Sequence, residues 1–552
     1  MFTIFDFAAL NDTVFPGYDY PPTMSNSYVC SVLVMLYFVP EIHNAMLESQ
    51  QRVGSVETKA KKNAKSAPLL TGELGFLFHQ MNSISSHAMC YPKPPGTSED
   101  PCRPIVGTFV PSNFLSNFAT MQEAVSLALL DDSPAAADMA RRPEAFYRFL
   151  LHHLDRELSV NSDGGKGSRQ SSKKGSKAKQ TRMIDSLQGL DSVSMNQFVT
   201  GSGPPSANLN RTYTVELSYE AFQNSSDESP DFMHLLQYSL SKHVRLPAWC
   251  EKRKKFETVV QRKIITTLPK MLSLSCACAG ARSEDKLPFW RKSNGLGHWV
   301  PEMIEIEIDD NGNVITRQLV HMSDSSESVW QEYRGKPLPD SVVATLKETS
   351  GVAGEVGTRS ARYRIDLVLT YLNEHANEGG ECTSGRHIVH TRVPSSYKKR
   401  ALCSQLENLR QCAADSDRVR KLTLLRDVAI EDFEKRIHFV EEQIKELETI
   451  EEDEWVLFNG PNVSSTTIDD ALAFHVPFKE PCIILFRQVD TDMDIIPEPQ
   501  VDTSDLFWNE SPLLPGVYMF ICTTRYKIAC LIHSLLLLTV LNKISKRHAS
   551  RW

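Results

Sequence analysis

The sequence predicts a mixed α/β fold in which helices come first and strands follow. Residues 26–160 look mainly helical, because apolar residues recur there at intervals of three and four. The clearest helical segments are 31–38, 72–81, 114–130 and 143–158. Later segments alternate apolar and polar residues, as half-buried strands do, and these are 211–219, 303–316, 362–372, 386–393 and 481–489. Within the second of these strand segments, Asn311-Gly312 has the composition of a tight hairpin turn.

Composition places the chain among ordinary globular proteins. It has 552 residues, 41% of them hydrophobic and 23% charged, which is enough for several average domains or one large domain with insertions. The net charge of −8 gives no global reason to expect electrostatic binding of nucleic acid. Twelve scattered cysteines suit a reducing compartment, the cytosol or the nucleus. Residues 1–17 lack a basic start and a continuous apolar run, so no signal peptide is expected.

Two insertions interrupt the predicted domain, which we place at residues 1–497. The first, at 161–183, is rich in Gly, Ser and Lys and is expected to be a disordered basic loop, with contact to RNA or an acidic partner as the alternative. The second, at 398–453, is expected to be helical. Its apolar residues step by four and three, as in a coiled coil, and are Phe433, Ile437, Val440, Ile444 and Leu447. A helical hairpin packed on its own domain is favoured over a partner-binding or self-associating coiled coil, because the stripe is short.

Residues 498–552 form a divergent tail. Its longest apolar run, 528–541, has 14 residues, fewer than the roughly 18–20 that a membrane-spanning helix needs. An amphipathic or buried helix, a tail anchor and an artefact of gene prediction all stay open for this segment.

Several stretches carry a resemblance to a known family. They are "FDFAALNDTVFPG" (5–17), "NSYVCSVLVMLYFVP" (26–40), "GELGFLFHQM" (72–81), "SNFLSNFATMQEAVSLAL" (112–129), "AWCEKRKKF" (248–256), "WVPEMIEIEI" (299–308) and "EWVLFNGPNVSSTTIDDALAFHVPFKEPCIILF" (454–486). Their order resembles the ubiquitin-specific protease fold, with its helical thumb, β-rich fingers and palm. Within that class the chain is most similar to the ubiquitin-hydrolase-like (UCH) domain of the catalytic subunit of PAN-type poly(A)-specific deadenylases. The resemblance runs from about residue 5 to residue 490.

The resemblance locates three degenerate hydrolase positions. Active members carry a Cys at the start of the first helix, where the helix N-terminus favours a thiolate, but this chain has Ser27. Their Gly-His-Tyr strand corresponds to 385–387, so Arg386 would replace the general base, and a guanidinium has no lone pair to accept a proton. Neighbouring strand residues face opposite sides, so we expect His387 to point away from Ser27. His390 shares the face of Arg386 but should lie roughly 13 Å along the strand.

The remaining candidates are weaker still. The residue that would orient the base maps to Asn459, which has no histidine to orient if Arg386 holds the base position. Cys30 comes nearly one helical turn after Ser27 and is expected to be a small buried residue. Both histidines, His387 and His390, are expected to be structural.

A zinc site in the fingers is not expected either. Family members often bind zinc there through two C-x-x-C pairs, which complete a tetrahedron of thiolates. The first pair falls on Gln197 and Thr200, and the second on Cys250 and Arg253, so one good ligand remains. No metal or other cofactor is therefore predicted.

The resemblance implies an inactive scaffold in mRNA poly(A)-tail shortening. The partners implied are the exonuclease domain of the full-length subunit and the pseudokinase regulatory subunit, with poly(A) RNA as an indirect contact and a cytoplasmic, P-body location. We see no exonuclease motif such as an Asp-x-Glu on a strand after residue 490, and no phosphate-binding Gly-rich loop. An active cysteine-type deubiquitinase and a non-catalytic ubiquitin-binding module are the alternatives.

Overall fold

The structure is a computed structural model, and the parts it describes make up most of residues 13–489. The described residues are 13–19, 27–57, 69–88, 106–130, 139–163, 182–201, 206–219, 231–276, 290, 298–321, 328–353, 359–373, 385–422, 428–449, 453–474 and 478–489. The chain divides into a unit of residues 1–494 and a unit of residues 495–552. The second unit lies outside the described residues, as do the predictions for the tail and for most of the basic insertion.

Helices from the first third of the chain form the thumb. They are α1 (Ser27–Tyr37), α2 (Pro40–Glu57), α3 (Leu70–Ser86), α4 (Ser112–Ala119), α5 (Gln122–Ser126), α6 (Arg142–Asp163) and α7 (Met183–Gln188). Every residue of α1 is buried, so this helix runs through the middle of the main hydrophobic core. Among the described residues no single helix is long and apolar enough to cross a membrane; α1 and the start of α2 pass that test only as a pair bent by 96°.

The single helix predicted over 114–130 is wrong, because the structure has two helices there. The Thr120 hydroxyl donates a 2.7 Å hydrogen bond to the carbonyl of Asn117, and Met121 is extended. A side chain that bonds to the local backbone competes with the helical hydrogen-bond ladder, which accounts for the break.

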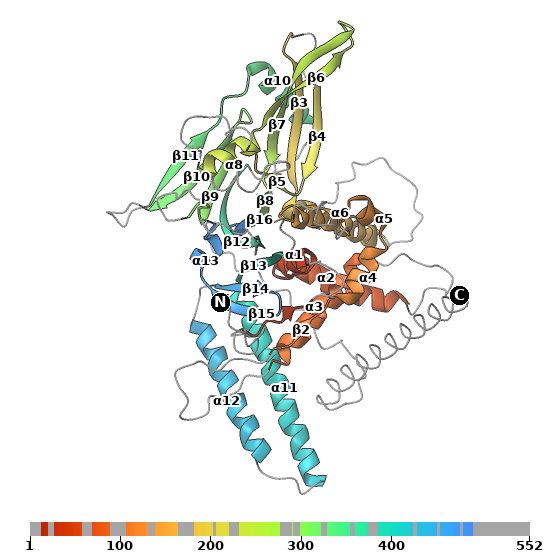
Figure 1. The fold of residues 1–552 in the computed structure, drawn as a ribbon, viewed down its shortest axis with the longest axis vertical. Coiled ribbons are helices and arrows are strands. Elements are labelled where there is room, and N and C mark those ends of the chain that lie inside the picture. Colours follow the sequence, from red (N-terminus) through yellow and green to blue (C-terminus); the bar gives the residue numbers. More distant parts are fainter. Residues whose placement is uncertain are drawn as a thin grey trace, which may run out of the picture. The chain divides into compact units, whose positions relative to one another are not determined.

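The palm is a ten-stranded sheet (Figure 1). Its strands are β5 (Val215–Glu216), β8 (Met271–Ser275), β9 (Met303–Ile308), β10 (Val314–His321), β11 (Ser328–Arg334), β12 (Ser360–Asn373), β13 (Gly385–Val393), β14 (Glu454–Asn459), β15 (Asn462–Thr466) and β16 (Lys479–Gln488). The main order is β11-β10-β9-β12-β13-β14-β15, and β16 pairs with both β12 and β8. Short strands β1 (Gly17–Tyr18) and β2 (Thr108–Phe109) pair with each other in parallel, and the Tyr18 N–H bonds to the carbonyl of Gly460.

The strand predictions hold for most of the palm. The hairpin at Asn311-Gly312 is confirmed, with Gly312 at a φ of +82° that a side chain would strain. The strand predicted over 211–219 is interrupted, because one strand ends at Thr212 and β5 covers only two residues. One face of the palm packs on α1 and the rest of the thumb, and the other carries α8 (Phe232–Leu240) and α13 (Ile468–Leu472).

The fingers are a separate four-stranded sheet. Its strands, β3 (Leu190–Phe198), β4 (Ser206–Thr212), β6 (His243–Cys250) and β7 (Lys255–Thr267), lie in the order β4-β3-β7-β6. Helix α10 (Asp340–Ala353) packs on part of one face, where it buries Val193, Met195 and Ile264. The structure therefore has the predicted α/β architecture of thumb, fingers and palm.

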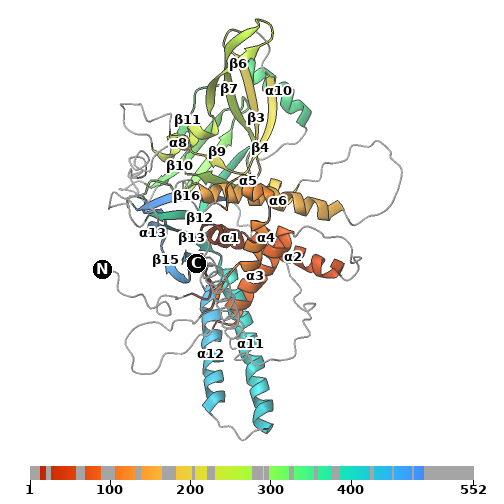
Figure 2. The same ribbon diagram turned by 45° about the vertical axis from the view of Figure 1, so that its right-hand side comes forward.

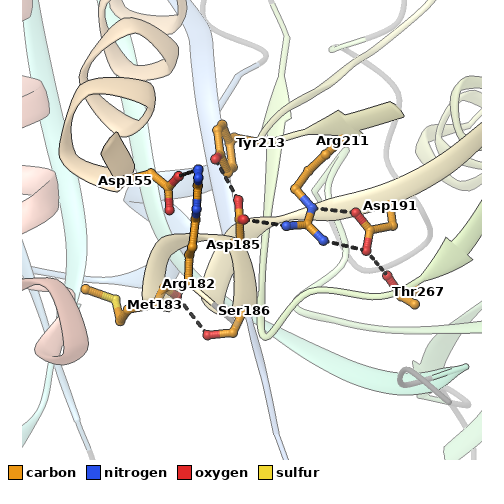
Figure 3. A network of polar contacts seen from close by, with 9 residues as sticks. All are labelled: Asp155, Arg182, Met183, Asp185, Ser186, Asp191, Arg211, Tyr213 and Thr267. Atoms are coloured by element: carbon orange, nitrogen blue, oxygen red, sulfur yellow. Dashed lines mark hydrogen bonds and ion pairs between the residues drawn. The ribbon is translucent and has the colours of Figure 1, made fainter. Parts of the chain in front are cut away.

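A polar network joins the thumb to the fingers (Figure 3). The guanidinium of Arg211, on β4, bonds to Asp191 at 2.5 and 2.9 Å and also pairs with Asp185 of α7. Arg182, just before α7, donates a 2.7 Å bond to the buried carboxylate of Asp155 on α6. The short helix α7 is thus held from both sides by ion pairs.

The second insertion is a helical hairpin, as predicted. Helices α11 (Ser395–Leu422) and α12 (Val428–Thr449) lie side by side (Figures 1 and 2). Val440 is buried against the main core, and the Gln405 side chain donates a 2.9 Å bond to the carbonyl of Ser85 on α3. These contacts match the favoured prediction of a hairpin packed on its own domain. Partner binding and self-association through the hairpin stay open as the alternative.

Candidate functional site

The residue at the degenerate nucleophile position lies at the start of α1. Ser27 is only 6% exposed, and its Oγ is 3.0 Å from Nδ1 of His387 on β13. Residues far apart in the chain thus form a serine–imidazole hydrogen bond where an active hydrolase would have its thiol and base. The distance lies within the range expected for a nucleophile and its general base.

Our prediction that His387 points away from Ser27 is wrong. His387 is 1% exposed, whereas Arg386 is exposed. His387 lies opposite Tyr371 of β12 and Arg386 opposite Leu372. The alternation of strand side chains holds, but the family alignment assigned the base to a residue one position too early. A shift of one residue moves every side chain of a strand to the other face.

Hydrogen bonding fixes which nitrogen of His387 carries the proton. Nε2 lies 2.8 Å from the carbonyl oxygen of Met139, which can only accept. Nε2 is therefore the protonated nitrogen of the neutral ring, and Nδ1 accepts the hydrogen bond of the Ser27 hydroxyl.

Tyr18 of β1 and Ser31 of α1 add further hydrogen bonds beside the pair. The Tyr18 hydroxyl donates a 2.8 Å bond to the carbonyl of His387 and lies 2.9 Å from Oγ of Ser31. The Ser31 hydroxyl in turn bonds to the carbonyl of Ser27 at 2.9 Å. Strand β1, helix α1 and strand β13 are thereby tied together at one buried point.

Burial decides the charge states at this site. It lowers the pKa of His387 to about 4, with nearby Arg142 acting in the same direction and the hydrogen bond to Met139 opposing it. Burial likewise raises the pKa of the Cys30 thiol to about 12, so this cysteine is a protonated core residue at neutral pH. Cys30 is fully buried, as predicted.

Asn459 does not orient His387. The Asn459 Oδ1 atom is buried and has no hydrogen-bond partner among the residues that the structure describes. The Nε2 atom of His387 is instead bonded to the carbonyl oxygen of Met139. A triad of the predicted three positions is therefore not assembled. His390 is also buried, on the face of β13 opposite to that of His387. Burial and nearby Lys479 lower its pKa well below the ordinary value.

The arrangement is better suited to fastening elements than to chemistry. A general base works best when its pKa lies near the operating pH, and a base with a pKa of about 4 drives proton transfer from a serine hydroxyl poorly. Both side chains are also almost fully buried. The hydrogen bond instead holds the N-terminus of α1 against the palm.

The degenerate zinc positions lie at the tip of the fingers, where an ion cluster replaces thiolates. The buried carboxylate of Glu257 accepts a 2.6 Å bond from the Thr200 hydroxyl and a 3.2 Å bond from Arg253. Cys250, the last residue of β6, is buried. The Gln197 side chain donates a 3.2 Å hydrogen bond to the hydroxyl of Ser341 on α10. Within the described ranges no group of three or more His, Cys, Asp or Glu side chains is placed to hold a metal.

Sequence reasoning missed Met139 and Glu257, which complete these two sites. Met139 acts through its backbone carbonyl, so its side chain gives no signal. Glu257 follows a run of basic residues on a strand. Strand alternation places it on the same face as Lys255, and this closeness of opposite charges was the signal available in the sequence.

Comparison with known proteins first defines the class. Residues 107–335 match the family model for ubiquitin carboxyl-terminal hydrolase. The match covers the fingers and part of the thumb and palm, but neither Ser27 nor His387. This part of the chain is therefore similar to ubiquitin carboxyl-terminal hydrolases, in agreement with the thumb, fingers and palm described above.

The relatives then narrow the class. The chain is 27% identical over 298 residues to the PAN2-PAN3 deadenylation complex catalytic subunit Pan2 of Mus musculus, covering 52% of this chain and 21% of the relative. It is 26% identical over 317 residues to the corresponding subunit of Phaeosphaeria nodorum, covering 55% and 23%. The solved Neurospora crassa Pan2 catalytic unit (protease and nuclease domain) matches with a TM-score of 0.50 and 16% identity, over 88% of this chain and 58% of that one. The predicted resemblance to the hydrolase-like domain of Pan2 is confirmed, and the matched region spans about a fifth of the length of these curated relatives.

Proposed function

We propose that this chain acts as a catalytically inactive scaffold domain of a PAN-type deadenylase subunit, in shortening mRNA poly(A) tails. Its relatives are named as catalytic subunits of the PAN2-PAN3 deadenylation complex, and one solved relative joins a protease domain to a nuclease domain. The observation that carries the inactive role is the sealed Ser27–His387 pair, because its base is buried and has a depressed pKa.

The proposed partners follow from the names of the relatives. We propose that the thumb and palm hold an exonuclease domain and contact the pseudokinase subunit of a PAN2-PAN3-type complex, in the cytoplasm and its P-bodies. In this role the fold supplies rigid surfaces, while phosphodiester hydrolysis takes place in the nuclease.

The rival function is a ubiquitin-directed hydrolase. The contact between Ser27 and His387 favours it, since the pair has the separation of a nucleophile and a base. A non-catalytic ubiquitin-binding module is a third possibility, and it predicts affinity for ubiquitin without turnover.

One set of assays separates these functions. The full chain is incubated with a ubiquitin C-terminal fluorogenic amide, with a ubiquitin vinylsulfone that labels cysteine and with a fluorophosphonate that labels activated serine. We expect no hydrolysis and no labelling, together with a stable complex when the chain is mixed with the nuclease domain and the PAN3-type subunit. Turnover or labelling of Ser27 would show an enzyme, and ubiquitin affinity without either complex would show the third function.

A further inference from the structure

The distal part of the β6–β7 hairpin exposes an aromatic pair. Trp249 lies directly opposite Phe256 in the strand register, so both rings are on the same face of the fingers. Trp249 is 46% exposed and Phe256 70% exposed, and their ring centroids are 5.4 Å apart with an interplanar angle of 73°. The edge-to-face geometry leaves ring surface open to solvent.

The aromatic pair lies at the tip of the sheet. Nearer the palm the same face is covered by α10, beyond which the hairpin extends (Figures 1 and 2). Val199, at the tip, is also exposed. Its N–H bonds to the carbonyl of Thr258, and this pairing places its side chain on the same face as the aromatic pair. Two large aromatic side chains left in water, side by side and beyond the part of the face that α10 covers, suggest a contact surface.

The hairpin is strongly basic although the chain is acidic. Residues 243–267 contain seven Lys and Arg residues against two Glu residues, a net charge of +5 in a chain of net charge −8. Arg245 and Arg262 lie opposite Val260 and His243, on the face of the aromatic pair. Lys252 is exposed at the turn and makes no ion pair with the residues that the structure describes.

We propose that this hairpin surface binds single-stranded RNA. The rings of Trp249 and Phe256 would stack on unpaired bases, and Arg245 with the lysines of the turn would pair with phosphates. Proteins that bind single strands of any sequence combine base stacking with phosphate pairing, because every base has a flat face and every phosphodiester carries a negative charge. The base faces of a duplex are stacked on one another, so a duplex would contact only the basic side chains of this surface.

The edge of the sheet argues against a protein strand as the occupant. Strand β6 is at the edge of the fingers, but Pro247 has no N–H to donate to an added strand. The proposal does not depend on the deadenylase assignment, since it concerns a surface outside the hydrolase positions.

Binding is tested by fluorescence anisotropy with the full chain and labelled A and U oligoribonucleotides of about twelve nucleotides. We expect both to bind, and a duplex of equal length to bind at least tenfold more weakly. The double variant Trp249→Ala/Phe256→Ala should weaken single-strand binding roughly tenfold or more. The variant Arg245→Glu/Lys252→Glu should weaken binding and reduce its dependence on salt.

Matched controls come from exposed residues away from the tip. Leu209→Ala removes an exposed apolar side chain of the same sheet, and Lys336→Glu reverses an exposed charge, and neither should change binding. Because a variant can misfold, the wild-type chain is also crosslinked to RNA containing 4-thiouridine, and the adduct should map to residues 243–256.

Four results would overturn the proposal. They are no RNA binding, equal binding of duplex and single strand, a double aromatic variant that binds as tightly as wild type, and displacement of RNA by polyglutamate as effectively as by unlabelled RNA. The last would identify an acidic protein as the occupant instead.

Discussion

Ser27 and His387 form a buried hydrogen bond between the first helix and the palm. Cysteine at this helix start would be favoured as a thiolate, whereas a serine hydroxyl next to a neutral imidazole is a hydrogen-bond donor. The imidazole is held on its other side by the carbonyl of Met139, so both nitrogens are satisfied inside the protein.

Replacing Ser27 by alanine is expected to destabilise the fold. The substitution leaves Nδ1 of His387 buried without its donor, which costs about 1–2 kcal/mol of unfolding free energy. Urea denaturation measures the change, with Ser116→Ala as control, because Ser116 is an exposed helical serine bonded to its own helix. Equal stability of Ser27→Ala and wild type would show that the bond is not formed.

Acid should weaken the fold through His387. Its pKa is about 4 when folded and ordinarily 6.5, so the unfolded chain binds the extra proton as pH falls from about 6.5 to about 4. Stability is therefore full above pH 6.5 and is lost in that window. At about pH 4.5 the loss should be about 2–3 kcal/mol.

The variant His387→Gln isolates the contribution of His387 to the pH dependence of the unfolding free energy. Unfolding free energies at about pH 7 and about pH 4.5 should differ less in the variant than in wild type. The other buried histidines, such as His43 with its pKa near 4, keep their contribution in both proteins. An unchanged pH dependence would mean that folding does not lower the pKa of His387.

At the scale of elements, the fingertip shows what can replace a metal site. Glu257 joins Thr200, just past the end of β3, to Arg253 in the β6–β7 turn, so a carboxylate links the two segments that thiolates and zinc would otherwise crosslink.

Glu257→Gln should lower the unfolding free energy by about 1–2 kcal/mol. The amide loses the charge and places an N–H₂ group beside Thr200 or Arg253, while the half-exposed Arg253 keeps the ionic part small. Thermal and urea unfolding give the value, and Glu251→Gln, at an exposed ion pair in the same turn, serves as control. Equal losses in both variants would exclude a special role for Glu257.

The α11–α12 hairpin should depend on Val440, which is deeply buried against the main core. Val440→Ala removes two methyl groups from the contact with the core and should cost about 1–2 kcal/mol. Hydrogen exchange of α12 should rise, whereas exposed Glu442→Ala should leave it unchanged. Light scattering of the wild-type chain should give a monomer at all concentrations; a dimer would restore the self-association alternative.

At the scale of the whole fold, the thumb and the fingers depend on a charged joint. Arg211 lies between Asp185 and Asp191, so it connects a helix of the thumb to the sheet of the fingers (Figure 3). The hydrogen bonds to these carboxylates keep the guanidinium charged and raise its pKa further.

Arg211→Met should destabilise the chain by about 1–3 kcal/mol, because it leaves two carboxylates near each other without their cation. The value stays modest, since Arg211 is about one-third exposed to water. Arg148→Met, which breaks one ion pair between the half-exposed Arg148 and the buried Glu144 within α6, is the matched control. Salt should narrow the difference between the two variants, and a difference that grows with salt would contradict an ionic joint.

By itself the sequence determined the α/β class, the helical start, most palm strands and the hairpin insertion, because these follow from periodicity and turn residues along the chain. It also determined the resemblance to deadenylase hydrolase-like domains, which matching stretches carry. Only the tertiary structure decided that His387, and not Arg386, meets Ser27, and that Glu257 joins the degenerate zinc positions. A strand's two faces differ by one residue, so an alignment offset of one is enough to reverse such an assignment, and contacts across hundreds of residues leave no local pattern to correct it.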